Sequence, residues 1–219
     1  MEDEIPVFDW IASDHHAGHK KISGFCGRPF EDGAEESYVM TENMVEKHNE
    51  LVSPNDIVWF LGDLALGDFR RSMEAVSRMN GRKFLMPGNH DHLHPYYQIK
   101  AGNGSSIEAK IRSEIEIYKS YGFEILPLEL SLLLDGIPCT FSHFPVELVK
   151  PFDDRYEQWR PSDSSRCVIH GHIHEKWRVK GLQINVGVEA WGGYPVSFRQ
   201  VIELAQQGAQ GLNIIQWER

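Results

Sequence analysis

The sequence is poor in cysteine and has no long hydrophobic run. Its three cysteines, Cys26, Cys139 and Cys167, lie far apart and form no C-x-x-C pair. They indicate neither a disulfide framework nor a thiolate zinc site, and they favour a reducing compartment. The N-terminus has acidic residues where a signal peptide needs a basic start, and no stretch has the length of a membrane span. We therefore expect a cytoplasmic protein with no membrane partner.

Positive charge is also scarce. Twenty-two Lys and Arg stand against thirty-two Asp and Glu, which gives a formal net charge of -10. This balance repels a polyanion, so duplex nucleic acid is an unfavoured partner. It leaves room for a small anionic substrate, because bound divalent ions can invert the local charge. Since no linker, repeat or low-complexity tract marks a boundary, we predict a single domain over residues 1–219.

Short apolar runs alternate with amphipathic stretches along the chain. The runs have strand length and end abruptly in polar residues; they are 7–12, 57–61, 84–86, 140–141 and 168–169. Apolar residues at helical spacing predict helices over 36–52, 69–79 and 107–118, with Val39 and Leu51 among the expected core residues of the first. Asp135-Gly136 predicts a hairpin turn, and 182–190 a second hairpin. We expect an α/β fold, a layered sandwich of mixed sheets flanked by helices.

Histidine is the informative residue type. Many of the eleven histidines lie beside Asp or Asn just after a predicted strand, in the segments 14–16, 88–91, 142–143 and 170–174. Imidazole and carboxylate groups are the usual ligands of Zn, Mn and Fe ions. In an extended segment residues i and i+2 point the same way, so Asp14 with His16, and His172 with His174, would each form a fork. Gly62, Gly88 and Gly171 would give the backbone room.

These motifs resemble the calcineurin-like metallophosphoesterases. The chain has D-x-H at 14–16, G-D at 62–63, G-N-H-D at 88–91, an isolated His143 and G-H-x-H at 171–174, in the order of that family. The resemblance implies a β-sandwich between helices and two divalent ions, Mn, Fe or Zn. It assigns metal one to Asp14, His16 and His174 and metal two to Asn89, His143 and His172, with Asp63 bridging both.

Two further segments narrow the resemblance. Residues 25–30 and 185–197 are similar to a small bacterial and phage branch of the family. Residues 62–68 lack the Asp-Arg-Gly ending that Ser/Thr protein phosphatases of the superfamily have, which argues against protein phosphatase activity.

The ligand set suggests a mechanism. A hydroxide bridging the two ions would attack the phosphorus in line, and Asn89 would also orient a phosphate oxygen. By the family's G-N-H motif, His90 would stabilise the phosphate and protonate the leaving oxygen. His19 would orient a ligand or lie on the surface. The loops 92–106 and 150–166, with Tyr96, Tyr97, Tyr156, Arg155 and Arg160, would bind a nucleobase and a phosphate or pack on the body, and Arg28 is a similar candidate.

The leading hypothesis is hydrolysis of small phosphodiesters, with nucleotides or cyclic nucleotides as substrates and phosphomonoesters as further ones. One alternative is a metal-dependent nuclease acting on single-stranded nucleic acid, which would need a basic channel. The other is a regulatory module that binds metal without turnover, against which the intact ligand set argues.

Overall fold

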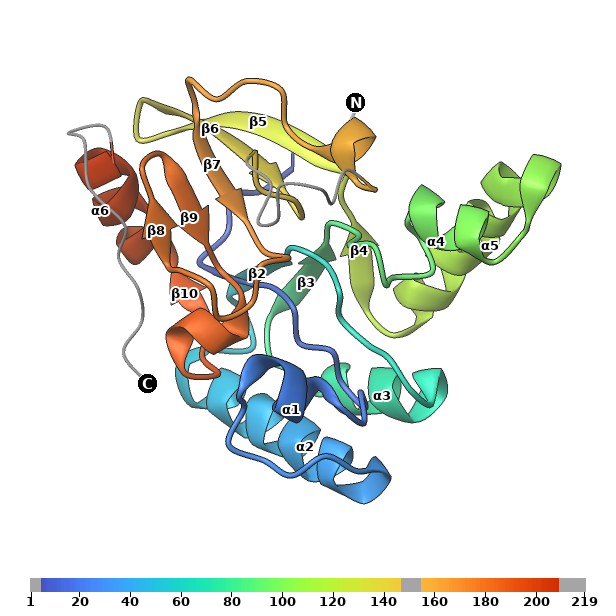
Figure 1. Ribbon diagram of the computed structural model, residues 1–219. Helices are drawn as coiled ribbons and strands as arrows, with labels where there is room; N and C mark the ends of the chain where they lie inside the picture. The colour runs from blue at the N-terminus through green and yellow to red at the C-terminus, as the bar shows by residue number, and fades with distance from the viewer. Residues whose placement is uncertain (1–4, 147–154, 209–219) are drawn as a thin grey trace.

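Two five-stranded mixed β-sheets pack face to face in the computed structural model, which describes residues 5–146 and 155–208 (Figure 1). The first sheet has the order β10-β1-β2-β3-β4, in which β1 to β4 are parallel and β10 is antiparallel. Its strands are β1 (Trp10–Ala12), β2 (Ile57–Phe60), β3 (Arg82–Leu85), β4 (Phe123–Ile125) and β10 (Val196–Ser197).

The second sheet has the order β5-β6-β7-β9-β8. Its three central strands are parallel, and β5 and β8 are antiparallel edge strands. The strands are β5 (Glu129–Leu134), β6 (Ile137–Ser142), β7 (Cys167–His170), β8 (Val179–Lys180) and β9 (Gln183–Asn185). Both sheets therefore combine parallel and antiparallel pairs, as predicted.

Alternating side chains of the first sheet fill two separate cores. On β2, Trp59 faces the second sheet and packs edge-on against Phe141 with ring centroids 5.0 Å apart. Its neighbours Val58 and Phe60 face the opposite side and pack beneath the helices. A strand buried on both faces is apolar throughout, which explains why these runs carry no polar alternation.

Helices cover the outer face of the first sheet and one end of the sandwich. In Figure 1, α1, α2 and α3 lie along the first sheet, α4 and α5 lie together to one side, and α6 packs beside β8 and β9. The α-helices are α1 (Ile22–Cys26), α2 (Ala34–Leu51), α3 (Phe69–Val76), α4 (Pro95–Lys100), α5 (Ile107–Ser120) and α6 (Phe198–Gly208). Short 3-10 helices are η1 (Gly104–Ser106), η2 (Glu157–Trp159) and η3 (Val188–Trp191). Across the described residues, no helix has both the length and the apolar character needed to cross a membrane.

The first predicted hairpin is confirmed and the second is wrong in position. Asp135 and Gly136 have φ values of 48° and 79°, the left-handed pair that a tight hairpin turn requires. The second hairpin joins β8 to β9 through Gly181, whereas residues 188–191 form the helix η3. The chain leaves the sheet there because Val188 N–H donates to the Ser13 carbonyl oxygen, 3.0 Å away in the loop after β1.

The predicted apolar stripes are only partly core. Val39 and Leu51 on α2 are 62% and 43% exposed, contrary to expectation. On α5, Tyr118 is buried, but Ile107, Ile111 and Ile115 are only partly buried because α5 packs beside α4 and the sheet edge rather than beneath a layer. Single-domain organisation stays a prediction.

Candidate metal centre

All the predicted ligands lie just beyond the carboxyl ends of strands. Asp14 and His16 follow β1, Asp63 follows β2 and Asn89 follows β3, while His143 follows β6, and His172 and His174 follow β7. Parallel strands present their carboxyl ends at one edge of a sheet, which is where open α/β sheets bind ligands. Backbone hydrogen bonds tie the loops together, including Asp14 N–H to Gly62 O at 3.0 Å and Gly171 N–H to His143 O at 3.1 Å.

The backbone is left-handed rather than extended at five of the seven predicted ligands. Asp14, His16, Asp63, His172 and His174 have φ values of 61°, 48°, 54°, 71° and 52°. Non-glycine residues rarely adopt this region, and such strain concentrates at functional sites. Asp14 and His16 do converge, as expected, but through a curled loop instead of the extended segment that the sequence suggested.

Two groups of ligand atoms form on either side of Asp63. Group one comprises Asp14, His16 and His174, whose ligand atoms lie within 4.8 Å of one another. Group two comprises Asn89, His143 and His172; the ligand atoms of His143, His172 and Asp63 again lie within 4.8 Å of one another. Asn89 Oδ1 is 3.1 Å from His143 Nε2. The two histidines His172 and His174 therefore separate into different groups.

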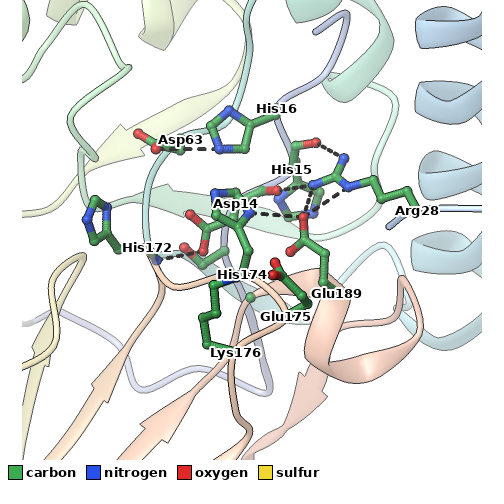
Figure 2. Close-up of polar contacts among 12 residues, drawn as sticks. Asp14, His15, His16, Arg28, Asp63, His172, His174, Glu175, Lys176 and Glu189 are labelled. Carbon is green, nitrogen blue, oxygen red and sulfur yellow. Dashed lines mark hydrogen bonds and ion pairs between the residues drawn. The ribbon is translucent and has the colours of Figure 1, made fainter. Parts of the chain in front are cut away.

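Asp63 lies between the two groups. Its Oδ2 is 3.5 Å from both His16 Nε2 and His143 Nε2. Figure 2 shows the contact with His16 as a dashed line. The other oxygen, Oδ1, accepts the backbone N–H of His90 at 2.8 Å, which fixes the orientation of the carboxylate.

Glycine is required where two loops press on the carboxylates. A Cβ on Gly88 would lie 2.4 Å from Asp63 Oδ1, and one on Gly171 would lie 2.4 Å from Asp14 Oδ2. Real Cβ atoms do not approach oxygen so closely, so any larger residue would push the carboxylates out of place.

The donor set fits a divalent cation. Asp14 Oδ1 and both ring nitrogens of His16 are buried and find no hydrogen-bond partner among the described residues. A buried polar atom left unpaired costs about 1–3 kcal/mol, which a bound cation would offset. Imidazole, carboxylate and amide oxygen together suit Mn, Fe or Zn.

The electrostatics of the centre also favour added positive charge. Burial raises the pKa of Asp14, which disfavours its charged form in the absence of a cation. Burial alone would raise the pKa of Asp63 as well, but the facing His143, His90 and His16 hold it well below its usual value. Although burial alone would lower it, the Asp63 carboxylate raises the pKa of His143 to about 9. The His143 ring therefore holds a proton near neutral pH, and a metal ion would displace that proton on binding.

His90 lies at the mouth of the centre without joining either ligand group. Its ring is half-buried and packs edge-on against His16, with centroids 5.3 Å apart. Two grooves meet at this residue. The group-one groove, of about 400 Å³, is lined by His16, His19, Phe25, His90, His174 and Lys176 among others, and His172 of group two also borders it. The group-two groove, of about 540 Å³, is lined by Asn89, His90, Tyr96, Tyr97, Lys100 and Tyr156 among others.

The two predicted substrate loops converge on the group-two groove. Tyr96 from the first loop packs against Tyr156 from the second, with ring centroids 4.8 Å apart. The guanidinium of Arg155 lies 5.5 Å from the Tyr156 ring. Residues 150–154 of the second predicted loop lie outside the described residues.

The remaining histidine candidates have local partners. His19 Nδ1 accepts the Lys21 N–H at 3.1 Å, and its ring faces His16 at 5.9 Å and lines the group-one groove. His15 is buried against Phe60, with ring centroids 5.3 Å apart. The buried His170 contacts the Gly171 carbonyl oxygen through Nδ1 at 2.8 Å. His15 and His170 therefore pack as structural side chains.

Arg28 packs inside the protein, which is the second of the two alternatives that the sequence left open. Its side chain is only 6% exposed. The guanidinium donates to the Glu189 carboxylate and to the carbonyl oxygens of Asp14 and His15, at 2.6 Å and 2.7 Å for the last two (Figure 2). Glu189 in turn contacts His174 Nδ1 at 3.0 Å. Nothing in the local sequence around residue 189 points to this role.

Asp91 is a second residue whose role the sequence left open. Its buried carboxylate accepts the backbone N–H groups of Asp63 and Gly88, both at 2.8 Å, and of Leu64 at 3.1 Å. It thereby fastens the loop after β2 to the loop after β3. The last letter of G-N-H-D was the available signal.

Comparison with known proteins identifies the family of the chain. The family model described as calcineurin-like phosphoesterase matches residues 10–178, most of the chain. The chain belongs to this family. It is therefore a metallophosphoesterase, a hydrolase that acts on phosphoesters and binds divalent metal.

Relatives occur in phages and archaea. The gene 66 protein of Mycobacterium phage D29 is 30% identical over 93% of this chain and 98% of its own length. The corresponding protein of phage L5 is 29% identical over 84% and 87%. An uncharacterized protein of Methanocaldococcus jannaschii is 25% identical over 91% and 92%. These relatives confirm the predicted small phage and bacterial-type branch of the family.

A solved structure shares the fold. A protein of unknown function from Aquifex aeolicus aligns with a TM-score of 0.58 at 21% identity, covering 89% of this chain and 97% of that one. At this identity the likeness concerns the fold alone.

Proposed function

We propose that this metallophosphoesterase hydrolyses small phosphodiesters with two divalent ions, one in each ligand group and both bound by Asp63. The observation that carries the proposal is the position of Asp63 Oδ2, 3.5 Å from a histidine of each group. When bound, such an ion pair polarises phosphoryl oxygens and activates a water near neutral pH for in-line attack. Manganese, iron and zinc all suit the donors.

The two grooves favour a diester over a monoester. A phosphodiester carries an organic arm on each of two ester oxygens, whereas a monoester carries one. His90 lines both grooves, so a phosphate beside it would have room for one arm on each side. The aromatic rings of Tyr96 and Tyr97 in the group-two groove suit a nucleobase, which favours nucleotides or cyclic nucleotides as substrates.

The protein side chains would perform separate tasks at the phosphate. Asn89, which is neutral, would contribute its oxygen to group two and leave its amide N–H groups to orient a phosphate oxygen. Asp63 would hold both ions at a fixed separation through a carboxylate anchored by the His90 N–H. His90 would donate a proton to the leaving oxygen, since its ring stands at the junction of the grooves without belonging to either group.

The test is a substrate panel run on protein stripped of metal and resupplied with Mn, Fe, Zn or Mg. The panel contains phosphomonoesters, cyclic and linear nucleotide diesters, and a single-stranded oligonucleotide. We expect diesters to give the highest kcat/KM, and Asp63→Asn to abolish turnover. Asp68→Asn is the matched control, because Asp68 is an exposed carboxylate that caps α3 and lies outside both groups.

The panel also separates the alternatives. Preferential cleavage inside the oligonucleotide would make the protein a nuclease on single strands. Binding of metal without hydrolysis of any panel member would make it a metal-binding regulatory module. Equal turnover by Asp63→Asn and wild type would contradict the proposed role of Asp63.

A further inference from the structure

We propose that Glu189 and Arg28 form a bracket that positions ligand group one, and that the affinity of this group for its ion depends on the bracket while that of group two does not. Both are positioning residues, because they act through His174 and the loop of Asp14. The inference rests on the proposed two-ion function and extends it to residues outside the ligand set.

The first half of the bracket fixes the His174 ring. His174 Nδ1 lies 3.0 Å from Glu189 Oε1. An ionised carboxylate can only accept a hydrogen bond, so Nδ1 carries the proton and Nε2 is left as the electron-pair donor of the ring. A carboxylate behind a ligating histidine sets its tautomer and orientation and increases its basicity.

The second half joins this carboxylate to the other ligands of group one. Arg28 Nε and Nη2 both donate to Glu189 Oε1, at 3.0 Å and 2.5 Å. Nη2 also donates to the Asp14 carbonyl oxygen at 2.6 Å, and Nη1 donates to that of His15 at 2.7 Å. One guanidinium thus spans the loop of Asp14 and His16 and the carboxylate that holds His174, as Figure 2 shows.

The two side chains of the bracket are buried, which restricts them to each other as charge partners. The side chains of Arg28 and Glu189 are 6% and 2% exposed. A buried pair of this kind is strongly damaged when one partner is removed, because the other charge stays buried without compensation. The Arg28 guanidinium is therefore kept away from solvent and bound to its partners in the protein. As a result, the loop of Asp14 and the ring of His174 are held at a fixed spacing.

Group two has a different support. His143 Nδ1 contacts the carbonyl oxygen of Leu61 at 2.7 Å, a backbone atom at the end of β2. Glu189 and Arg28 form hydrogen bonds with atoms of Asp14, His15 and His174 but none with His143, His172 or Asn89 among the described contacts. Loss of the bracket should therefore affect the two groups unequally.

The same carboxylate belongs to a second cluster that could be taken for an ion site. The ligand atoms of Cys26, His174 and Glu189 also lie within 4.8 Å of one another. The positive charge of Arg28 lies beside the Glu189 carboxylate and repels any further cation at that position. The contacts instead favour Glu189 as a partner of His174, and a cobalt spectrum can check this, because thiolate ligation by Cys26 would add a sulfur charge-transfer band.

The experiment measures Mn²⁺ affinity by calorimetry in two backgrounds. His143→Ala disables group two and leaves group one to bind the ion, whereas His16→Ala does the reverse. In the His143→Ala background we expect Glu189→Gln to weaken Mn²⁺ binding roughly 10- to 100-fold. In the His16→Ala background the same substitution should change affinity less than about threefold.

Controls guard against general damage. Glu114→Gln is the matched control, because the Glu114 carboxylate also contacts a histidine ring nitrogen, 3.5 Å away on His92, outside both groups. It should leave both affinities unchanged. Arg28→Lys keeps the charge but cannot span all the acceptors, so it should weaken group one to a smaller degree; it also serves if Glu189→Gln fails to fold.

The outcomes are distinct. Unchanged group-one affinity in Glu189→Gln and Arg28→Lys would overturn the bracket, as would an equal loss in both backgrounds. A cobalt–thiolate band in wild type that Cys26→Ser removes would also overturn it in favour of the Cys26 cluster. If wild type binds two ions and hydrolyses nothing, the proposed function fails, while an unequal loss of affinity would still support the bracket.

Discussion

The two ligand groups are supported by different kinds of contact. In group two, His143 rests on the Leu61 carbonyl oxygen, and Asp91 fastens the neighbouring loops through backbone N–H groups. In group one, support comes from the side chains of Arg28 and Glu189. The ring partner of His143 is a backbone atom that no substitution removes, whereas the ring partner of His174 is a side chain that one substitution changes. Group one should therefore be the group whose affinity for its ion a single substitution, Glu189→Gln, weakens selectively.

Among substitutions that leave Asp63 and both ligand groups intact, the largest effect should come from His90. His90→Ala should lower kcat for diesters with poor leaving groups by roughly 10²- to 10⁴-fold, because proton donation to the leaving oxygen is lost. Substrates with good leaving groups should lose much less. Both ions should still bind, which metal analysis of the variant would check. Full turnover on poor leaving groups would show that the assignment of His90 is wrong.

Removing the Asp91 carboxylate should test what fastens the loops around group two. Asp91→Ala leaves three buried N–H groups, those of Asp63, Leu64 and Gly88, without their acceptor. At about 1–3 kcal/mol for each, the free energy of unfolding should fall by roughly 3 kcal/mol or more. Urea unfolding measures this, and Asp91→Asn, which keeps one oxygen, should lose less. A stable Asp91→Ala protein that had lost only group-one binding would reverse the comparison.

A third prediction concerns the pH dependence of the free energy of unfolding. It involves His48 on α2, which belongs to neither group. Burial lowers the pKa of His48 to about 4 from 6.5, although its contact with the Asn80 carbonyl oxygen acts the other way. Between pH 4 and 6.5, His48 is protonated in the unfolded chain but neutral in the folded protein. The free energy of unfolding should therefore fall as pH drops from 6.5 to 4, by up to about 1.4 kcal/mol per pH unit for this group.

Denaturant unfolding of metal-free wild type and His48→Gln across this range isolates that contribution. Glutamine can still donate to the Asn80 carbonyl oxygen but does not titrate. The variant should show a shallower slope by about one proton. Parallel curves would mean that His48 is protonated in the folded protein.

The smallest effects should come from the grooves, and they should differ between the two. Tyr97→Ala should raise KM for nucleotide diesters roughly tenfold with little change in kcat, because base stacking on an aromatic ring is worth about 1–3 kcal/mol. Phe25→Ala in the group-one groove should act more weakly, since Phe25 is 68% exposed. Tyr194→Ala, at a partly exposed ring that is hydrogen-bonded to Glu50 and lines neither groove, is the control. Identical KM values for Tyr97→Ala and wild type would show that the nucleobase does not bind in the group-two groove.

The positions of the strands and the convergence of the predicted ligands could be predicted from the sequence. Apolar runs that end in Asp, Asn or His fix where β1, β2, β3, β6 and β7 stop, and parallel strands bring those ends together. The order of the motifs then indicated the family. These features depend on local patterns, which a single sequence displays.

The remaining features depend on contacts distant in sequence. The left-handed φ values at Asp14 and His172 run against the preference of those residues, and only the packed loops enforce them. The pairing of Arg28 with Glu189 spans 161 residues and leaves no local pattern. The exposure of Val39 likewise follows from how α2 lies on the sheet, which helical spacing alone does not determine.

We propose that two ions held around Asp63 carry out the hydrolysis. The direct measurement is to titrate metal-free protein with Mn²⁺ while following bis(p-nitrophenyl) phosphate hydrolysis and bound metal in the same sample. We expect little hydrolysis until the second equivalent binds, and none in Asp63→Asn. Full hydrolysis by metal-free protein, or a rate that is maximal at one equivalent, would contradict it.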